Sequence, residues 1–319
     1  MANILIVHAH PEPQSFSTSL ARTAAATLAT AGHQVVFSDL YAQRFDPVSD
    51  RRNFTTTADP AYLKQQVEEA HATEHAGFVP ELDAEMRKVE ACDLLIFSFP
   101  LWWYGMPAIL KGWVDRVLAY GRMYGEGRWF ETGFARDKRA MVLMTTGGGA
   151  AGYGGHGFNP SLEAILTPIH HGIFWFNGMS PLPPFVAWSA AHGTDSDRHA
   201  VLAQWQTRLA GIFAEPPYQL PPTTDFDPET ALDTVPRFMV TLTRTRPVDA
   251  PYHSLIPAQI AALEALRRDG LLLSAHTAPW DAADWHGFLL FRAPTAAAVT
   301  ALCQTLPLHN DLTVQIIPL

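Results

Sequence analysis

The sequence has little cysteine. Cys92 and Cys303 are the only two among 319 residues, so the chain has no disulfide framework and no cysteine cluster with the spacing of metal ligands. Runs of lysine or arginine are also absent, and the formal net charge is −9. A partner with a phosphate backbone, such as DNA or RNA, needs concentrated positive charge. We therefore expect a small molecule or a protein as the partner and no nucleic acid.

Long apolar runs are missing as well. No uninterrupted run reaches the length of a membrane span, and the N-terminal MANILIVHAHPEP enters an apolar strand without a basic leader or a cleavage site. We expect no membrane insertion and a cytoplasmic location, which also suits the low cysteine content. What the chain does have is 48% apolar residues and a length sufficient for two domains.

Short apolar runs alternate with helical patterns through the first two thirds of the chain. This alternation predicts an α/β domain over residues 1–213 with a flavodoxin-like, doubly wound parallel sheet of five strands, whose ligands bind at the carboxyl ends of the strands. Three loops should meet at that edge: His10–Ser17, Pro100–Tyr104 and Thr145–Tyr153. A polar excursion runs from Asp39 to Pro80. The expected strands are Ile4–Val7, Val35–Phe37, Leu94–Phe99, Met141–Thr145 and Pro184–Trp188, and the expected helices include Phe16–Ala31, Pro107–Leu118, Leu162–His171 and Thr194–Phe213, the last with a capping box of Thr194 and Asp197.

A proline-rich connector and a second unit follow. Residues 214–236 contain six prolines and little periodicity, which is typical of an extended connector. Residues 237–319 then show the order strand, helix, strand, strand, helix, strand, which predicts a ferredoxin-like βαββαβ domain of the α+β class. The expected elements are Phe238–Thr243, Ser254–Asp269, Leu271–Thr277, Trp285–Phe291, Pro294–Thr305 and Leu312–Ile317.

The composition of the first loop suits the binding of a phosphate, and that of the third loop suits the close approach of a ligand. HPEPQSFS (His10–Ser17) leads into a helix N-terminus, where free N–H groups and the helix dipole favour a phosphate. No Walker-type lysine accompanies it, and Ser15 and Ser17 have helix capping as a simpler role. Gly147–Gly152 matches the dinucleotide pattern G-x-G-x-x-G, but it follows the fourth strand and opens no helix, so we discount that match. Its glycines instead allow backbone N–H groups to approach a ligand closely.

The second loop is aromatic. PLWWYG ends a buried strand and places Trp102, Trp103 and Tyr104 in a turn, where residues normally lie on the surface. Packing of the sheet edge is one role for these rings, and a platform for a flat ligand is the other. A phosphate turn, an aromatic turn and a glycine loop at one edge would together hold a flat ring system with a phosphorylated tail, and a flavin fits that description.

Several ordered motifs resemble one family. PLWWYGMPAILKGWVDRV, with LIVHAHPEPQSF before it and TTGG after it, is similar to the NAD(P)H:quinone oxidoreductase family, the DT-diaphorase-like flavoproteins of flavodoxin-like fold. SDLYAQRFDP (Ser38–Pro47) and EPPYQLPP (Glu215–Pro222) also resemble family segments. The likeness therefore covers approximately residues 1–230.

The resemblance implies a homodimer that binds FAD, with FMN as the alternative flavin. It also implies that NAD(P)H and then a quinone or related aromatic acceptor use the same flavin face, with two-electron, ping-pong transfer; the choice between NADH and NADPH stays open. The residues that match catalytic or substrate-contacting positions of the family are Tyr124, Tyr153 and Asn159, and those that match its cofactor-binding positions are His10, Phe16, Ser17, Pro100, Leu101, Trp102, Trp103, Tyr104, Thr145, Thr146, Gly147, Gly148 and Arg198.

Asn159 is a departure from the mammalian members, which have a histidine there, paired with the tyrosine that matches Tyr153. An asparagine donates a hydrogen bond but carries no proton at neutral pH. His156 is three residues away and could take that role, although an exposed loop histidine without a role is the simpler interpretation. The departure concerns the proton route, because the hydride chemistry belongs to the flavin.

The second unit has a resemblance of its own. Its ending LPLHNDLTVQIIPL and its element order are similar to the muconolactone isomerase-like dimeric α+β barrels, and an accessory or oligomerisation domain is the favoured interpretation. Two other functions stay open: a regulatory flavoprotein of a potassium-efflux system, and a bifunctional enzyme whose barrel acts on a lactone or an aromatic-derived substrate. The choice between dimer and tetramer is also open. Polar and aromatic candidates in this unit, whose spacing does not require catalysis, are His253, His276, His286, His309, Trp280 and Trp285.

Overall fold

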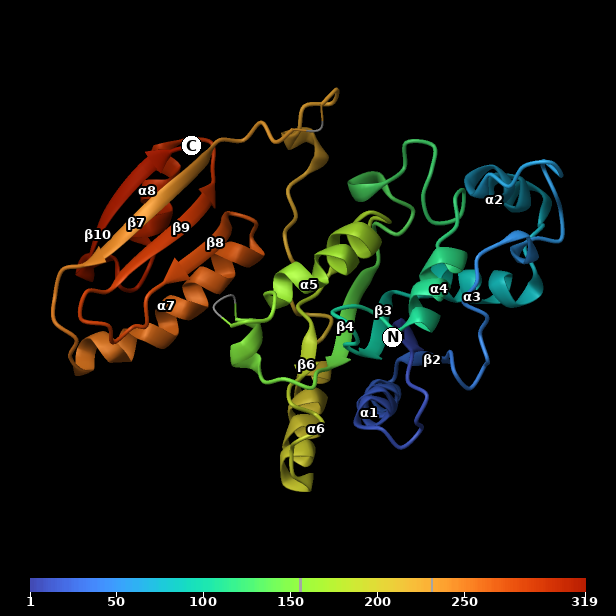
Figure 1. Cartoon of the computed structure of the whole chain (residues 1–319), viewed down its shortest axis with the longest axis horizontal. Coiled ribbons are helices and arrows are strands. Elements are labelled where there is room, and N and C mark those ends of the chain that lie inside the picture. The colour runs from blue at the N-terminus through green and yellow to red at the C-terminus, as the bar shows by residue number, and fades with distance from the viewer. Residues whose placement is uncertain (155–156, 231) are drawn as a thin grey trace. The chain divides into compact units, whose positions relative to one another are not determined.

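The chain forms two compact units. The computed structural model describes residues 1–154, 157–230 and 232–319, and the units are Met1–Pro217 and Tyr218–Leu319 (Figure 1). The boundary between them lies inside the proline-rich segment. Each unit has a hydrophobic core of its own.

One parallel sheet organises the first unit. Its described strands are β1 (Asn3–His8), β2 (Gln34–Asp39), β3 (Leu94–Pro100), β4 (Arg139–Thr145), β5 (Ser180–Pro181) and β6 (Phe185–Ala187). They follow the order β2-β1-β3-β4, and β5 and β6 both pair with β4. Because β5 lies against the start of β4 and β6 against its end, the two short strands share the fifth position. The predicted flavodoxin-like sheet of five parallel strands is thereby confirmed.

The edge of the sheet differs from the single predicted strand near Pro184–Trp188. Pro183 and Pro184 have no N–H to donate, so a continuous ladder cannot form along this edge. Leu182 N still donates to the Ala140 carbonyl at 2.8 Å, next to the short β5. The prolines therefore divide one edge strand into two.

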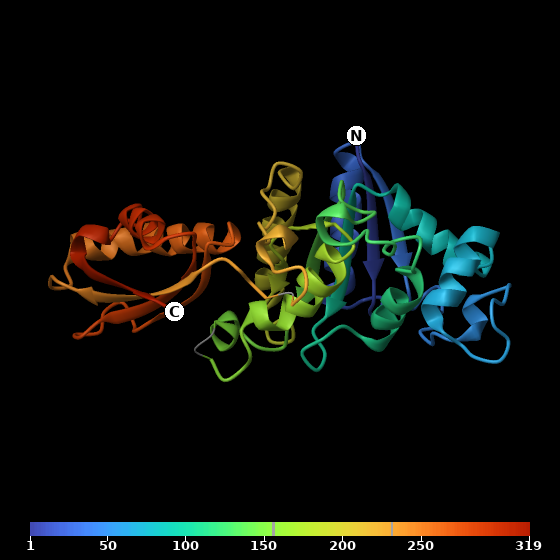
Figure 2. The same cartoon turned by 90° about the horizontal axis from the view of Figure 1, so that it is seen from above.

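Helices cover both faces of this sheet (Figure 2). The described helices of the first unit are α1 (Phe16–Thr30), α2 (Gln65–His75), α3 (Pro80–Ala91), α4 (Ala108–Val117), α5 (Leu162–Ile169) and α6 (Asp195–Ala210), with the short turns η1 (Arg51–Asn53), η2 (Phe130–Thr132) and η3 (Ala150–Tyr153) and the π-helical turn η4 (His170–Trp175). Leu5 and Val7 of β1 share a core with α3, α4 and α5, whereas Ile4 and Ile6 share a core with α1 and α6. Burial on both faces explains why the strands read as continuous apolar runs.

Helix α2 lies in the segment that the sequence analysis treats as a polar excursion. Its contacts with distant backbone hold it in place: Glu68 Oε2 accepts from Ala58 N at 2.8 Å, and Glu69 Oε2 accepts from Tyr120 N at 2.7 Å. Buried carboxylates with partners outside their own helix leave no periodic apolar signal. The sequence pattern therefore gave no sign of this helix.

Helices α5 and α6 differ in how well their ends were predicted. The capping box at the start of α6 is confirmed, since Asp197 N donates to Thr194 Oγ1 at 3.2 Å and Thr194 N donates to Asp197 Oδ2 at 2.8 Å. Helix α5 ends before the predicted His171. Pro168 lies in its last turn, and the chain continues as the π-helical η4.

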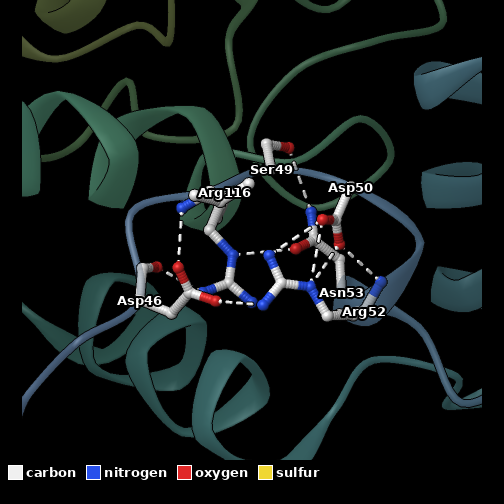
Figure 3. A network of polar contacts seen from close by, with 7 residues as sticks. Asp46, Ser49, Asp50, Arg52, Asn53 and Arg116 are labelled. Atoms are coloured by element: carbon white, nitrogen blue, oxygen red, sulfur yellow. Dashed lines mark hydrogen bonds and ion pairs between the residues drawn. The ribbon is translucent and has the colours of Figure 1, made fainter.

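A polar network fastens loop 46–53 to α4 (Figure 3). Arg116 is 2% exposed; its Nε donates to Asn53 Oδ1 at 2.8 Å and its Nη1 donates to the Asp46 carbonyl. Arg52 forms an ion pair with the Asp46 carboxylate at 2.8 Å. The loop is thus held by a buried guanidinium as well as by surface charges.

The second unit is an α+β domain. Its described elements are η5 (Thr223–Asp225), β7 (Arg237–Arg244), α7 (Ala250–Arg268), β8 (Leu272–Thr277), β9 (His286–Arg292), α8 (Ala296–Gln304), η6 (His309–Asp311) and β10 (Leu312–Pro318). The sheet is antiparallel with the order β10-β7-β9-β8, and both helices lie on one side of it (Figure 2). Alternate strand residues such as Val240, Leu242 and Leu289 face those helices in the core. The predicted βαββαβ order is observed.

His8 is buried at the end of β1. Its Nδ1 lies 3.0 Å from Ser98 Oγ and its Nε2 lies 3.0 Å from Thr18 Oγ1, so a neutral imidazole can donate to one hydroxyl and accept from the other. Burial lowers the pKa of His8 from 6.5 to about 4. This side chain joins β1, β3 and α1 in its uncharged form.

We predict that Gly112→Ala destabilises the first unit. A Cβ at Gly112 would overlap the backbone of Pro47, and loop 46–53 cannot retreat without breaking its Arg116 contacts. Overpacking of this kind costs about 1–3 kcal/mol, measurable as a lower urea midpoint. Gly172→Ala is the matched control, because a Cβ there meets nothing within 4 Å. Equal midpoints for the two variants would contradict the close packing.

We predict that the first unit loses stability as the pH falls from 6.5 to 4. In that window the unfolded chain binds a proton that folded His8 excludes, so stability rises with pH there. The difference approaches about 3 kcal/mol at pH 4. Urea denaturation at several pH values should show a correspondingly weaker pH dependence for His8→Gln. His170, whose pKa burial also lowers to about 4, is present in both proteins and cancels. Parallel curves would refute the role of His8.

Candidate functional site

Thr145 connects the three loops at the carboxyl ends of β1, β3 and β4. Its Oγ1 lies 2.7 Å from Ser17 Oγ, and its carbonyl accepts a hydrogen bond from Leu101 N at 2.8 Å. Pro100 is its partner in the register between β3 and β4. The Ser17 and Thr145 side chains are buried, so the contact between them is shielded from water. These four predicted residues therefore lie together.

The first loop leads into α1 through a capped N-terminus. Ser15 Oγ accepts a hydrogen bond from Thr18 N at 3.1 Å, which confirms the capping role for Ser15. Ser17 lies in the first helical turn, and its hydroxyl bonds to Thr145 and not to the helix N–H groups. Phe16 opens the helix and packs against the core. The first turn of α1 holds no acidic residue, so no carboxylate within the helix offsets the positive end of its dipole.

The aromatic turn is strained and exposed. Trp102 N donates to Gly105 O at 3.2 Å, and Gly105 N donates back to Trp102 O at 2.9 Å. Between them Trp103 and Tyr104 have φ values of 52° and 57°, the left-handed region that usually takes Gly or Asn, as in type I′ turns. The Trp103 side chain is 99% exposed. Sheet-edge packing therefore does not account for Trp103, and the Trp102 ring lies 6.0 Å from that of His10 in the first loop.

Asn159 joins the aromatic turn to the glycine loop, because it contacts Tyr104 and its N donates to the Gly152 carbonyl at 3.3 Å. Tyr104 Oη donates to Asn159 Oδ1 at 2.8 Å. The Tyr153 ring lies 3.1 Å from the point where Gly148 would carry a Cβ, and its centroid is 5.4 Å from that of Trp188. A larger residue at Gly148 would therefore push against Tyr153. The predicted residues of the second and third loops meet through these contacts.

The glycine loop is held by hydrogen bonds at Thr146 and is open to solvent at Gly147. Thr146 is buried; its N donates to Ala187 O at 3.1 Å and its Oγ1 donates to Gly148 O at 2.8 Å. Gly147 is exposed, and a Cβ there would meet nothing within 4 Å. Backbone N–H groups on this edge can be approached from solvent.

Two predicted site residues, Tyr124 and Arg198, contact segments other than the three loops. The Tyr124 ring packs 5.4 Å from that of Phe176, and burial raises the pKa of the Tyr124 hydroxyl. Arg198 donates to the Gly193 carbonyl at 2.6 Å and to Asp195 Oδ1 at 2.8 Å. Neither contact reaches the three loops. His156 lies outside the described residues.

His8 and Trp188 were not predicted as site residues. His8 contacts Thr18 in the first turn of α1, directly after the first loop, and the Trp188 ring lies beside that of Tyr153. The available signals were the histidine pair in HAH at the end of a strand and an aromatic residue directly after the last short strand. Both residues lie at the carboxyl ends of parallel strands, the edge of an open α/β sheet where ligands bind.

A metal centre of three or more side chains and a membrane-spanning helix find no support in the part of the chain that the structure describes. Among residues 1–154, 157–230 and 232–319, no group of three or more His, Cys, Asp or Glu side chains could hold a metal ion. None of the described helices is long and apolar enough to cross a membrane. In the second unit Trp285 stacks on Trp280 at 5.0 Å and is buried in the core. The candidate histidines there are spread over four elements, at His253 in α7, His276 in β8, His286 in β9 and His309 in η6.

Known proteins resemble the first unit in sequence and in fold. A family model described as flavodoxin-like fold matches residues 2–209. The chain is 36% identical over 224 residues to ribosyldihydronicotinamide dehydrogenase (quinone) of Rattus norvegicus, covering 70% of this chain and 97% of that protein. It is 38% identical over 224 residues to NAD(P)H dehydrogenase (quinone) 1 of the same species, covering 70% and 82%. The crystal structure of a protein from Klebsiella pneumoniae described as a quinone reductase aligns with a TM-score of 0.71 and 32% identity, covering 73% of this chain and 94% of that one.

The match in sequence extends over nearly the whole of the first relative, and the match in structure over nearly the whole of the Klebsiella pneumoniae protein. The chain therefore belongs to the flavodoxin-like family, among its NAD(P)H:quinone oxidoreductases, and is an oxidoreductase.

Proposed function

We propose that the chain is a flavin-dependent NAD(P)H:quinone oxidoreductase that passes a hydride from NAD(P)H through the flavin to a quinone or related aromatic acceptor. The observation that carries this proposal is the turn Leu101–Tyr104, which holds the exposed Trp103 in a strained backbone. Strain of this kind persists where the surrounding structure fixes it, typically at functional sites. The open backbone at Gly147 belongs to the neighbouring loop. Two relatives named as quinone dehydrogenases support the acceptor class.

The residues at the site fit FAD, with FMN as the alternative. The capped N-terminus of α1 offers its first N–H groups and the positive end of its dipole to a phosphate, beside His10 and Ser17. Gly147 and Gly148 offer backbone N–H groups and have no side chains of their own, and Trp103 offers an aromatic face. A bound flavin supplies the hydride transfer. We assign Arg198 to the same cofactor because its position matches a cofactor-binding position of the family.

Asn159 and Tyr153 orient the reacting molecules in this proposal. The Asn159 amide oxygen accepts from Tyr104, so its NH₂ group is directed to donate to a carbonyl oxygen of the acceptor. Tyr153 can donate its hydroxyl in the same way. The Asn159 amide carries no proton that it can transfer at neutral pH, so the proton of the reduced product has another source. We assign Tyr124 to stacking against the acceptor.

NAD(P)H and the acceptor share one binding face in this proposal. The described part of the first unit presents one aromatic turn beside one glycine loop, and every predicted cofactor contact except Arg198 belongs to the connected loops. Occupation of one face in turn gives ping-pong kinetics. We further propose a homodimer and a cytoplasmic location, which the two free, buried thiols of Cys92 and Cys303 suit.

The second unit is proposed as an accessory or oligomerisation domain. In β9 Phe288 is 44% exposed next to the core residue Leu289, so it lies on the face of the sheet away from the helices. Exposed apolar groups on a sheet face favour association with another surface. Residues 1–217 form a compact unit with the three loops, so the chemistry is assigned to that part.

The proposal predicts a complete flavin cycle in the purified chain. The protein should carry or take up FAD, lose its visible absorbance when NAD(P)H is added without oxygen, and regain it when benzoquinone is added. Spectrophotometry with identification of the released cofactor measures each step. Residues 1–217 alone should show the same cycle. A colourless protein that binds no flavin and does not oxidise NAD(P)H would refute the proposal.

The proposal also predicts a specific effect of Trp103→Gly. Glycine adopts positive φ without strain, so the urea midpoint should be unchanged or higher. Loss of the ring should weaken flavin binding by about two- to tenfold, the range of one aromatic contact, as measured by fluorescence titration. Trp103→Phe keeps a ring and should retain most of the affinity. Unaltered flavin binding in the glycine variant would remove Trp103 from the platform.

A further inference from the structure

Two histidines lie one turn apart on α2, outside the three loops. The imidazole rings of His71 and His75 are stacked, with centroids 4.2 Å apart and planes inclined by 29°. His71 is half-buried and His75 is exposed, so the pair can be reached from solvent. Residues four positions apart share one face of a helix, and the same spacing places two histidine ligands on one zinc ion in H-E-x-x-H sites. The end of α2 therefore presents two neighbouring nitrogen donors.

The hydrogen bond of His75 determines which of its nitrogens is available. Its Nδ1 lies 2.8 Å from the His71 carbonyl oxygen. Because a carbonyl only accepts, the proton of the neutral imidazole is on Nδ1, and Nε2 keeps its lone pair. Histidines that bind metals usually donate their other ring N–H to a carbonyl or a carboxylate in this way, which fixes the ring. His75 thus already has the arrangement of a metal ligand.

The charge around the pair favours a cation. Helix α2 ends at His75, so the pair lies near the negative end of the helix dipole. The helix contains three glutamates and no lysine or arginine. Two protonated imidazoles at this spacing would repel each other, whereas one shared metal ion lets both rings stay neutral.

Two neutral imidazoles select a transition metal over Mg²⁺ or Ca²⁺, which take oxygen ligands. Metal–nitrogen bonds of about 2.0–2.1 Å place two adjacent ligand nitrogens about 3 Å apart, a distance that these stacked rings reach by rotation of their side chains. No third His, Cys, Asp or Glu side chain joins the pair among the described residues, so water completes the coordination. In such an open site the affinity follows the general order of divalent ions, in which Cu²⁺ binds most tightly.

We propose that His71 and His75 form a two-histidine site that binds a divalent transition-metal ion, with Cu²⁺ preferred over Zn²⁺. The site is separate from the loops of the proposed function and does not depend on the flavin. A bound ion links two successive turns at the end of α2, so it protects that end of the helix against local opening.

Isothermal titration with Cu²⁺ in a weakly coordinating buffer tests the proposal on the full chain as purified, without a polyhistidine tag. The tightest site should saturate at one ion per chain and bind Zn²⁺ more weakly. His71→Asn and His75→Asn should each lower the Cu²⁺ affinity at least about tenfold, because a single imidazole replaces a chelating pair.

His199→Asn is the matched control. His199 is exposed on α6, and its Nδ1 lies 2.7 Å from the carbonyl oxygen four residues before it, as in His75, but that residue is Asp195 and not a histidine. This variant should keep the affinity of the unaltered chain.

Hydrogen exchange locates the ion. Cu²⁺ should slow amide exchange in peptides that cover the end of α2 in the unaltered chain and not in His75→Asn. Four results would overturn the inference: tight binding retained in both α2 variants, an equal loss in His199→Asn, tighter binding of Zn²⁺ than of Cu²⁺, or unchanged exchange at the end of α2. Should either α2 variant fail to fold, exchange in the unaltered chain with and without Cu²⁺ still decides.

Discussion

The register between β3 and β4 is the constraint on which the candidate site depends. It sets Pro100 opposite Thr145, so the aromatic turn begins where the glycine loop begins. The buried contact of Thr145 with Ser17 then ties α1 to the same edge. Because side chains alternate along a strand, a slip of one residue would turn Thr145 to the other face and separate the loops. Sheet pairing and site assembly therefore depend on the same register.

The main elements and the meeting of the loops were predictable because they follow from burial. A parallel sheet covered on both faces gives continuous apolar runs, and its carboxyl edge gathers the loops. The edge strand was harder to predict, because Pro183 and Pro184 interrupt its hydrogen-bond ladder. Helix α2 was missed because the buried side chains of Glu68 and Glu69 bond to backbone outside the helix, which a local pattern does not contain.

The roles of the site residues also divide into those that local sequence predicts and those that only the tertiary structure defines. Ser15 and Ser17 have the same side chain two positions apart, yet one caps a helix and the other reaches a strand more than a hundred residues away. Local sequence favours capping for both, and only the tertiary structure separates them.

The backbone of the aromatic turn has a consequence for binding. Trp103 and Tyr104 hold two successive left-handed conformations, and the hydrogen bonds between Trp102 and Gly105 fix them in the folded chain. The conformational entropy of ordering this backbone is lost during folding, before any ligand arrives. A ring that stacks on Trp103 therefore meets a preorganised surface, and more of the contact free energy remains as affinity.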